Sequence, residues 1–158
     1  LYRPDDPFEL SKDIWVIGTM NTADRSVALI DAALRRRFHF VPFFPNQGPM
    51  RDLLDRWLRR EGAPAWVGEL VAQVNDELER ALGGPHLQLG PSHFMKHALD
   101  QEAVRRIWQY DIEPFIEDQF FGDATQIEYF RFPKVWNRFK YLAEESIDET
   151  QDSDERED

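Results

Sequence analysis

One stretch near the start of the chain restricts the possible folds more than any other. Residues 14–19 (Ile-Trp-Val-Ile-Gly-Thr) are mostly apolar and include β-branched side chains, which predicts a strand buried on both faces. Residues 21–24 (Asn-Thr-Ala-Asp) predict a turn. Over residues 26–38, apolar side chains recur at three- and four-residue spacing, which predicts a helix. With a second predicted strand at 38–44, the order strand, helix, strand predicts a parallel α/β unit.

After Pro49 the pattern becomes helical. Apolar residues at helical spacing predict three helices, at residues 51–60, 66–82 and 101–119, with an interruption at Pro114 in the last. Gly83 and Gly84 are expected to end the second of these helices. Residues 86–96 predict a short extended piece and a turn, and residues 120–141 predict short aromatic-rich elements that pack back on the helices.

The predicted fold class is therefore α/β: the last parallel strands of a nucleotide-hydrolysing type of core, followed by a mostly helical domain. The Asn-Gln-Gly-Pro sequence at 46–49 marks the expected boundary. We expect residues 1–46 to belong to the α/β part and residues 47–141 to form the helical domain. Residues 142–158 are expected to be a disordered acidic tail, because they are too charged and too poor in apolar residues to pack.

The net charge of -11 is unevenly distributed along the chain. Residues 144–158 contain nine acidic residues and one arginine, so the rest of the chain carries only about -3. A body without a basic excess is a poor main surface for DNA, because phosphates must be neutralised by cations. For the same reason the aromatic residues between 120 and 139 are a weak candidate for binding single-stranded nucleic acid.

The composition indicates the cellular compartment of the chain. Cysteine is absent, which excludes disulfides and thiolate metal sites and is typical of an intracellular protein. No apolar run reaches the length of a membrane span and no signal peptide is visible, so we expect a cytoplasmic chain with no membrane contact and no metal site of its own. Because the first residue is not Met, we expect the chain to be truncated or processed.

The turn after the first predicted strand holds two candidate binding residues. Asn21 follows the carboxyl end of the strand, where parallel sheets bind ligands. Its amide can position a terminal phosphate and an attacking water, or it can satisfy its own backbone in a turn. Asn21 and Asp24 have the Asn-x-x-Asp spacing of the motif that recognises guanine in GTP-binding proteins. An aspartate at this position is also typical of a turn or of the start of a helix.

Arg35, Arg36 and Arg37 end the helix predicted over residues 26–38. Successive helical residues point about 100° apart, so the three side chains cannot share one role. Cations suit the negative end of a helix dipole. Alternatively, one of them reaches a nucleotide in a neighbouring subunit and stabilises transition-state charge there. The spacing leaves both interpretations open.

These residues resemble the McrB family, AAA+ GTPase subunits of methylcytosine-dependent restriction systems. The resemblance rests on Ile-Gly-Thr-Met-Asn-Thr-Ala-Asp-Arg-Ser at 17–26 and on Asp-Ala-Ala-Leu-Arg-Arg-Arg-Phe at 31–38. Residues 90–95 (Gly-Pro-Ser-His-Phe-Met) look like the family's Gly-His-Ser-Tyr-Phe-Met segment, and residues 108–114 are similar to the helix that follows it. The resemblance covers about residues 13–122 and implies a partial AAA+ P-loop-type core followed by a helical lid.

The resemblance also implies roles for individual residues. Asn21 matches the family's sensor asparagine beside the γ-phosphate and the water, and Asp24 matches an aspartate linked to nucleotide handling. In the arginine cluster, Arg36 and Arg37 are expected to be catalytic from a neighbouring subunit, and Arg35 is expected to contact the nucleotide.

The lid segment matches the family only in part. Ser92 is expected to contact the cofactor from the lid, while Pro91 and His93 replace the histidine and tyrosine of the family segment. A lone histidine such as His93 is more typical of a structural role.

The implied cofactor is GTP or ATP with Mg²⁺, bound mainly by the Walker motifs. The present residues contain no Gly-x-x-x-x-Gly-Lys-Ser/Thr loop, so this chain alone is not expected to hydrolyse a nucleotide. The implied assembly is a hexameric homo-oligomeric ring with a separate nuclease subunit, contacting DNA through other regions. An alternative is a non-catalytic module that docks on such a ring, and a phosphate loop with an Asp-Glu pair encoded upstream would decide between the two.

Overall fold

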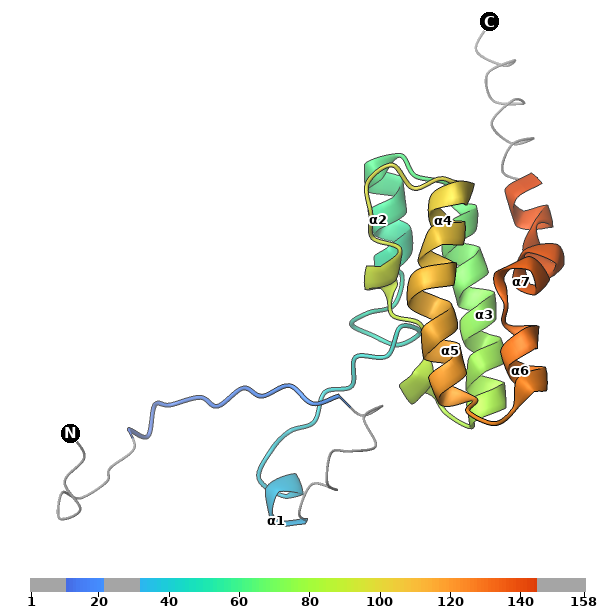
Figure 1. Cartoon of the computed structure of the whole chain (residues 1–158). Coiled ribbons are helices and arrows are strands. Elements are labelled where there is room, and N and C mark those ends of the chain that lie inside the picture. The colour runs from blue at the N-terminus through green and yellow to red at the C-terminus, as the bar shows by residue number, and fades with distance from the viewer. Residues whose placement is uncertain (1–10, 22–31, 145–158) are drawn as a thin grey trace, which may run out of the picture.

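In the computed structural model, residues 11–21 and 32–144 are described, and every regular element among them is helical (Figure 1). The α-helices are α1 (Ala32–Arg35), α2 (Leu53–Glu61), α3 (Trp66–Leu82), α4 (Gln101–Ile107), α5 (Glu113–Gln119), α6 (Ala124–Tyr129) and α7 (Phe132–Phe139). Two short 3₁₀ turns, η1 (Pro85–Leu87) and η2 (Pro91–His93), and one π-helical turn, η3 (Trp108–Ile112), complete them. The helices predicted over 51–60 and 66–82 are confirmed, as are the short elements after residue 120.

Helix α3 is the centre of a helical bundle. Helix α2 lies on one side of it, the α4–η3–α5 rod runs alongside it, and α6 and α7 pack on the remaining side (Figure 1). The core is formed by apolar side chains from α2, α3, α4, η3, α5 and α7 and from the loops between them, and Ile127 of α6 packs against it. Its fully buried members include Leu58, Val67, Val74, Leu78, Phe94, Val104, Trp108, Ile116, Phe130 and Val135. Burial of this apolar surface is the main force that stabilises the helical bundle.

Two helix ends follow the expected glycine chemistry. Gly83 has φ 76° and its N–H donates to the carbonyl of Glu79, which ends α3 at the predicted residue. Gly62 ends α2 with φ 62°. Both residues lie in the left-handed region, which glycine enters without the steric cost of a Cβ atom. At the start of α4, the Asp100 carboxylate accepts a hydrogen bond from the backbone N–H of Ala103 at 2.7 Å.

The expected interruption at Pro114 takes the form of a widened turn rather than a break. The chain passes from α4 through η3 into α5 without leaving helical geometry. Proline has no N–H, and its ring would meet the carbonyl four residues earlier in a regular α-helix. The π-helical turn immediately before Pro114 accommodates this change. It places both Trp108 and Ile112 in the core, and the Trp108 indole N–H donates to the carbonyl of Phe130 at 2.9 Å.

The two predicted strands are not formed in the part of the chain that the structure describes. Residues 14–20 and 39–44 are irregular, and Trp15 and Ile17 are 89% and 90% exposed. A strand buried on both faces needs neighbouring strands for its backbone hydrogen bonds and helices to cover it. The described residues supply neither, so the α/β core is not confirmed, whereas the helical domain is. Of the predicted first helix, Ala32–Arg35 is helical, and residues 22–31 lie outside the described residues.

Candidate functional site

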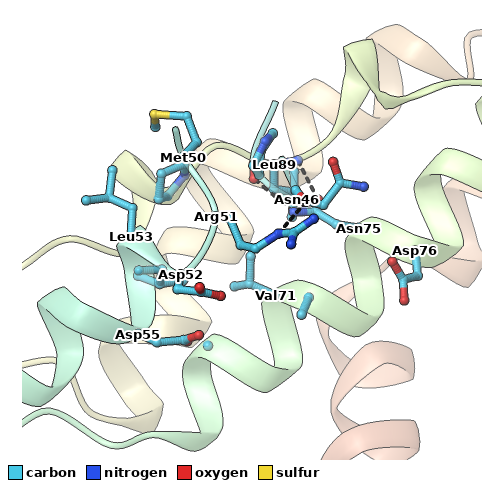
Figure 2. Close-up of a pocket in the computed structure, with 15 residues that line it drawn as sticks. Asn46, Met50, Arg51, Asp52, Leu53, Asp55, Val71, Asn75, Asp76 and Leu89 are labelled. Atoms are coloured by element: carbon cyan, nitrogen blue, oxygen red, sulfur yellow. Dashed lines mark hydrogen bonds between the residues drawn. The ribbon is translucent and has the colours of Figure 1, made fainter. Parts of the chain in front are cut away.

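One hollow of the bundle lies where the chain enters the helical domain. It is a cavity of ≈ 290 Å³ between the segment at residues 45–52, the first turn of α2, the middle of α3 and the loop at residues 89–91 (Figure 2). Apolar side chains from α2, α3 and both loops form most of its wall, including Leu54, Val71 and Leu89. A concave, mostly apolar space with a few polar groups is the usual form of a small-molecule site.

A buried asparagine fixes one wall of this cavity. Asn75 in α3 is 4% exposed, and its side-chain amide pairs with the backbone of Leu89 in both directions. Its Nδ2 donates to the Leu89 carbonyl at 3.1 Å, and its Oδ1 accepts from the Leu89 N–H at 2.6 Å. Because a buried backbone group without a partner costs free energy, this pair holds the loop at residues 89–91 against α3.

A second asparagine ties the entry segment to the same helix. Asn46 Nδ2 donates to Glu79 Oε2 at 3.1 Å, and the Asn46 carbonyl accepts from Arg51 Nε at 3.4 Å. Figure 2 shows the Arg51 guanidinium directed toward Asn46. Glu79 also accepts from Gln88 Nε2 at 2.9 Å, so the chain on both sides of the cavity is attached to one carboxylate.

Three carboxylates line the cavity. Among the described residues, none of Asp52, Asp55 and Asp76 forms an ion pair. Asp52 has φ 59° and precedes α2, and Asp55 lies so close to α3 that a Cβ on Gly68 would overlap its carboxylate. The wall thus combines apolar contact with hydrogen-bond acceptors, which suits a planar polar ring with N–H groups at its edge.

Most of the described site residues that were predicted from the sequence do not line this cavity. Asn21 is exposed at the end of the irregular segment. Arg35 ends α1 with its guanidinium 5.9 Å from the centre of the Phe40 ring, and Arg36 and Arg37 follow it on the surface. The predicted Asp24 lies outside the described residues.

Ser92 comes nearest to the cavity among the predicted contacts. It is exposed in η2, next to Pro91, which lines the cavity. His93 is half-buried beside Phe94, with ring centres 6.5 Å apart. The loop that carries the family-like segment is therefore part of the cavity rim.

Sequence reasoning missed Asn46 and Asn75. For Asn75 a signal was available: an amide stands within the buried stripe of residues 66–82, four residues after Val71 and three before Leu78. A polar residue at a core position of a helix must find a partner, so it predicts a specific contact. Asn46 carried no comparable signal, because asparagine is ordinary in a turn.

Among residues 11–21 and 32–144, no group of three or more His, Cys, Asp and Glu side chains is suited to hold a metal ion. No helix there is both long and apolar enough to cross a membrane.

The bundle, the entry segment and the cavity between them define an α-helical lid domain. Residues 67–128 match the family model described as McrB, alpha-helical lid domain. The chain is 31% identical over 131 residues to the type IV methyl-directed restriction enzyme EcoKMcrB subunit of Escherichia coli (strain K12). The alignment covers 75% of this chain and 28% of that relative. The resemblance to the McrB family is therefore confirmed over these residues. No solved structure matches this chain.

Proposed function

We propose that this chain is the sensor-and-lid part of an AAA+ nucleoside triphosphatase that acts as the motor subunit of a modification-dependent DNA restriction system. Its lid match and its similarity to the E. coli restriction subunit support this proposal. Hydrolysis of GTP or ATP with Mg²⁺ would use a phosphate loop elsewhere in the complete protein. DNA and a separate nuclease subunit would be bound outside these residues.

The cavity where the chain enters the lid is the main observation that supports this proposal. It joins the segment at residues 45–52 to α2 and α3, so a ligand in it touches both the chain entering the lid and the lid itself. A volume of ≈ 290 Å³ accommodates a nucleobase. We assign the base to this cavity, with apolar contact from Leu54 and Val71 and hydrogen-bond acceptors from the aspartates at its wall.

The exposed apolar segments support the α/β half of the proposal. Ile14, Val16, Val41 and Phe43 are 54–70% exposed in the described chain. Large exposed apolar patches mark surfaces that are covered in the functional state. In the complete protein, residues 14–19 and 38–44 would pair as strands with the remaining strands of the core. Asn21 would then stand at the phosphate edge of the sheet, and Arg36 and Arg37 would reach the next subunit.

The base assignment is tested by filling the cavity. Ala72 is exposed on α3 and lines the cavity, so Ala72→Trp places a large ring in it without removing a core side chain. In the full-length protein we expect this substitution to weaken binding of a fluorescent GTP or ATP analogue at least about tenfold, because the base loses its space. Ala124→Trp, an exposed alanine in α6 away from the cavity, is the matched control. Equal affinity of the two variants for the nucleotide analogue would show that the base does not bind in this cavity.

A further inference from the structure

The outward side of α2 carries a cluster of arginines. Arg56, Arg59 and Arg60 are exposed. Their spacing of three and four residues places them together on one side of the helix, opposite the buried Leu54 and Leu58. Like charges at this spacing repel each other and destabilise the helix. An anion bound to this side of α2 would relieve the repulsion.

Two further basic residues lie beside this cluster. The Arg60 guanidinium lies 4.2 Å from the centre of the Trp57 ring, and the centre of the His97 ring lies 5.9 Å from the same point. His97 also pairs with Glu61 at 2.8 Å, which holds its loop against the end of α2. Lys96 is exposed next to His97 in that loop. The basic face of α2 therefore consists of Arg56, Arg59, Arg60, Lys96 and His97.

Most of this charge has no carboxylate partner within the described ranges. Glu61 pairs with Arg60 and His97. None of Arg56, Arg59 and Lys96 forms an ion pair with another described residue. By contrast, the two arginines of α4 share one glutamate, and the arginine that precedes α7 pairs with two glutamates of α5. The basic face of α2 thus suits a partner that carries several carboxylates.

The same chain contains such a partner. Residues 145–158, the acidic segment, include eight acidic residues and one arginine. This segment lies outside the described residues, and α7, which comes before it in the chain, lies on another side of α3 from α2 (Figure 1). Its 14 residues span about 46 Å when extended, whereas two helices packed side by side are about 20 Å across. The acidic segment is therefore long enough to reach the basic face.

We propose that the acidic segment docks on the basic face of α2 in the same copy. Its carboxylates would neutralise Arg56, Arg59 and Lys96. Tethering favours the contact, because a segment attached by a short chain has an effective concentration on the order of millimolar. The docked segment would keep other polyanions off this face of the lid. The contact uses no residue that lines the cavity at the lid entry, so it is independent of nucleotide binding there.

Zero-length cross-linking of the whole chain tests the contact. A carbodiimide joins a carboxylate to an amine only where the two groups are in contact, and Lys96 supplies the amine on the basic face. Peptide mass spectrometry of the monomer band should find links between the acidic segment and Lys96. These links should fall at least about threefold at about 1 M salt, where the Debye length is about 3 Å. Lys140 lies close to the segment in the chain, so its links report tethering alone, and links to Lys140 without links to Lys96 would overturn the proposal.

Two double variants separate docking from a general attraction of charge. Arg56→Gln/Arg59→Gln removes two cations of the basic face, so links to Lys96 should fall at least about threefold. Arg80→Gln/Lys134→Gln removes two exposed cations from α3 and α7 and should leave these links unchanged. Links to Lys96 that fall equally in both variants, or that occur only in the dimer band, would overturn the proposal.

Binding of a second polyanion gives an independent readout. Replacing the four acidic residues at 152–157 of the whole chain by their amides should strengthen the binding of fluorescent heparin at least about threefold, because the basic face is uncovered. Adding Arg56→Gln/Arg59→Gln should remove this gain, and adding Arg80→Gln/Lys134→Gln should retain it. No gain, or a gain that both pairs of substitutions leave unchanged, would show that the acidic segment does not cover this face.

Discussion

At the scale of single residues, Asn75 holds the loop at residues 89–91, which forms one wall of the cavity. Its amide replaces the hydrogen bonds that the Leu89 backbone would otherwise make with water. A short apolar side chain at this position would leave both backbone groups buried and unpaired. The loop at residues 89–91 would then lose its only side-chain anchor to α3 among the described contacts.

Replacing this residue should be costly for the fold. We expect Asn75→Ala to lower the free energy of unfolding by about 2–4 kcal/mol, because two buried backbone groups lose their partners. Urea unfolding followed by tryptophan fluorescence measures the change. Asn137→Ala, an exposed asparagine of α7, should stay within about 0.5 kcal/mol of the parent. Equal effects at the two positions would show that the Leu89 contact does not hold the loop.

At the scale of elements, α3, α6 and α7 are joined by a polar cluster at the bundle surface. Glu77 accepts from the Tyr129 hydroxyl at 3.0 Å and pairs with Arg138 Nη2 at 3.0 Å. The Arg138 guanidinium also lies 3.9 Å from the centre of the Tyr129 ring. Burial raises the pKa of Tyr129, and the hydrogen bond to Glu77 raises it further.

Because the pKa of Tyr129 is raised in the folded state, the free energy of unfolding of the bundle depends on pH in the alkaline range. The unfolded chain loses the Tyr129 proton near pH 10, while the folded chain holds it to higher pH. The stability from Tyr129 is therefore fully present below pH 10 and is lost as the pH rises through the folded pKa. We expect Tyr129→Phe to flatten the fall in the free energy of unfolding between pH 9 and pH 11. An unchanged slope in Tyr129→Phe would contradict the assignment.

The elements also show what the sequence could predict. Helical periodicity located α2 and α3 because each helix carries its own apolar stripe, and Gly83 marked the end of α3. It could not predict the π-helical turn, because that depends on how Trp108 and Pro114 fit one core. The two predicted strands are not formed in the described residues, because a strand needs neighbouring strands for its backbone hydrogen bonds. The described residues do not include such neighbours. Except for Ser92, which lies in η2, the predicted site residues lie in the same part of the chain as these strands. The cavity had to be found from the fold.

At the scale of the whole molecule, the chain divides into a packed bundle and an exposed segment before it. The core consists of residues between Leu54 and Leu142, whereas residues 11–21 and 32–43 keep most of their apolar side chains in water. A protease needs an unpacked backbone, so packing predicts where the chain is cut.

Limited proteolysis therefore tests the expected domain boundaries. We expect a low dose of chymotrypsin to cleave among the aromatic residues before position 46. The resistant fragment should begin near residue 44 and extend to about residue 144, because Leu142 packs in the core and residues 141–144 are helical. Mass spectrometry of the resistant fragment gives its ends. Early cleavage after Phe94 or Trp108, which are fully buried, would contradict a bundle that is stable by itself.

The central claim is that Asn21 acts within its own subunit while Arg36 and Arg37 act on the next one. The most direct measurement mixes two full-length variants, Asn21→Ala and the double variant Arg36→Ala/Arg37→Ala, and follows GTP and ATP turnover. Each variant alone should be nearly inactive, because every site lacks one group. In an equimolar mixture, about a quarter of the sites combine an intact asparagine with intact neighbouring arginines, so about a quarter of the parent turnover should return. A mixture as inactive as its components would contradict arginine action across subunits.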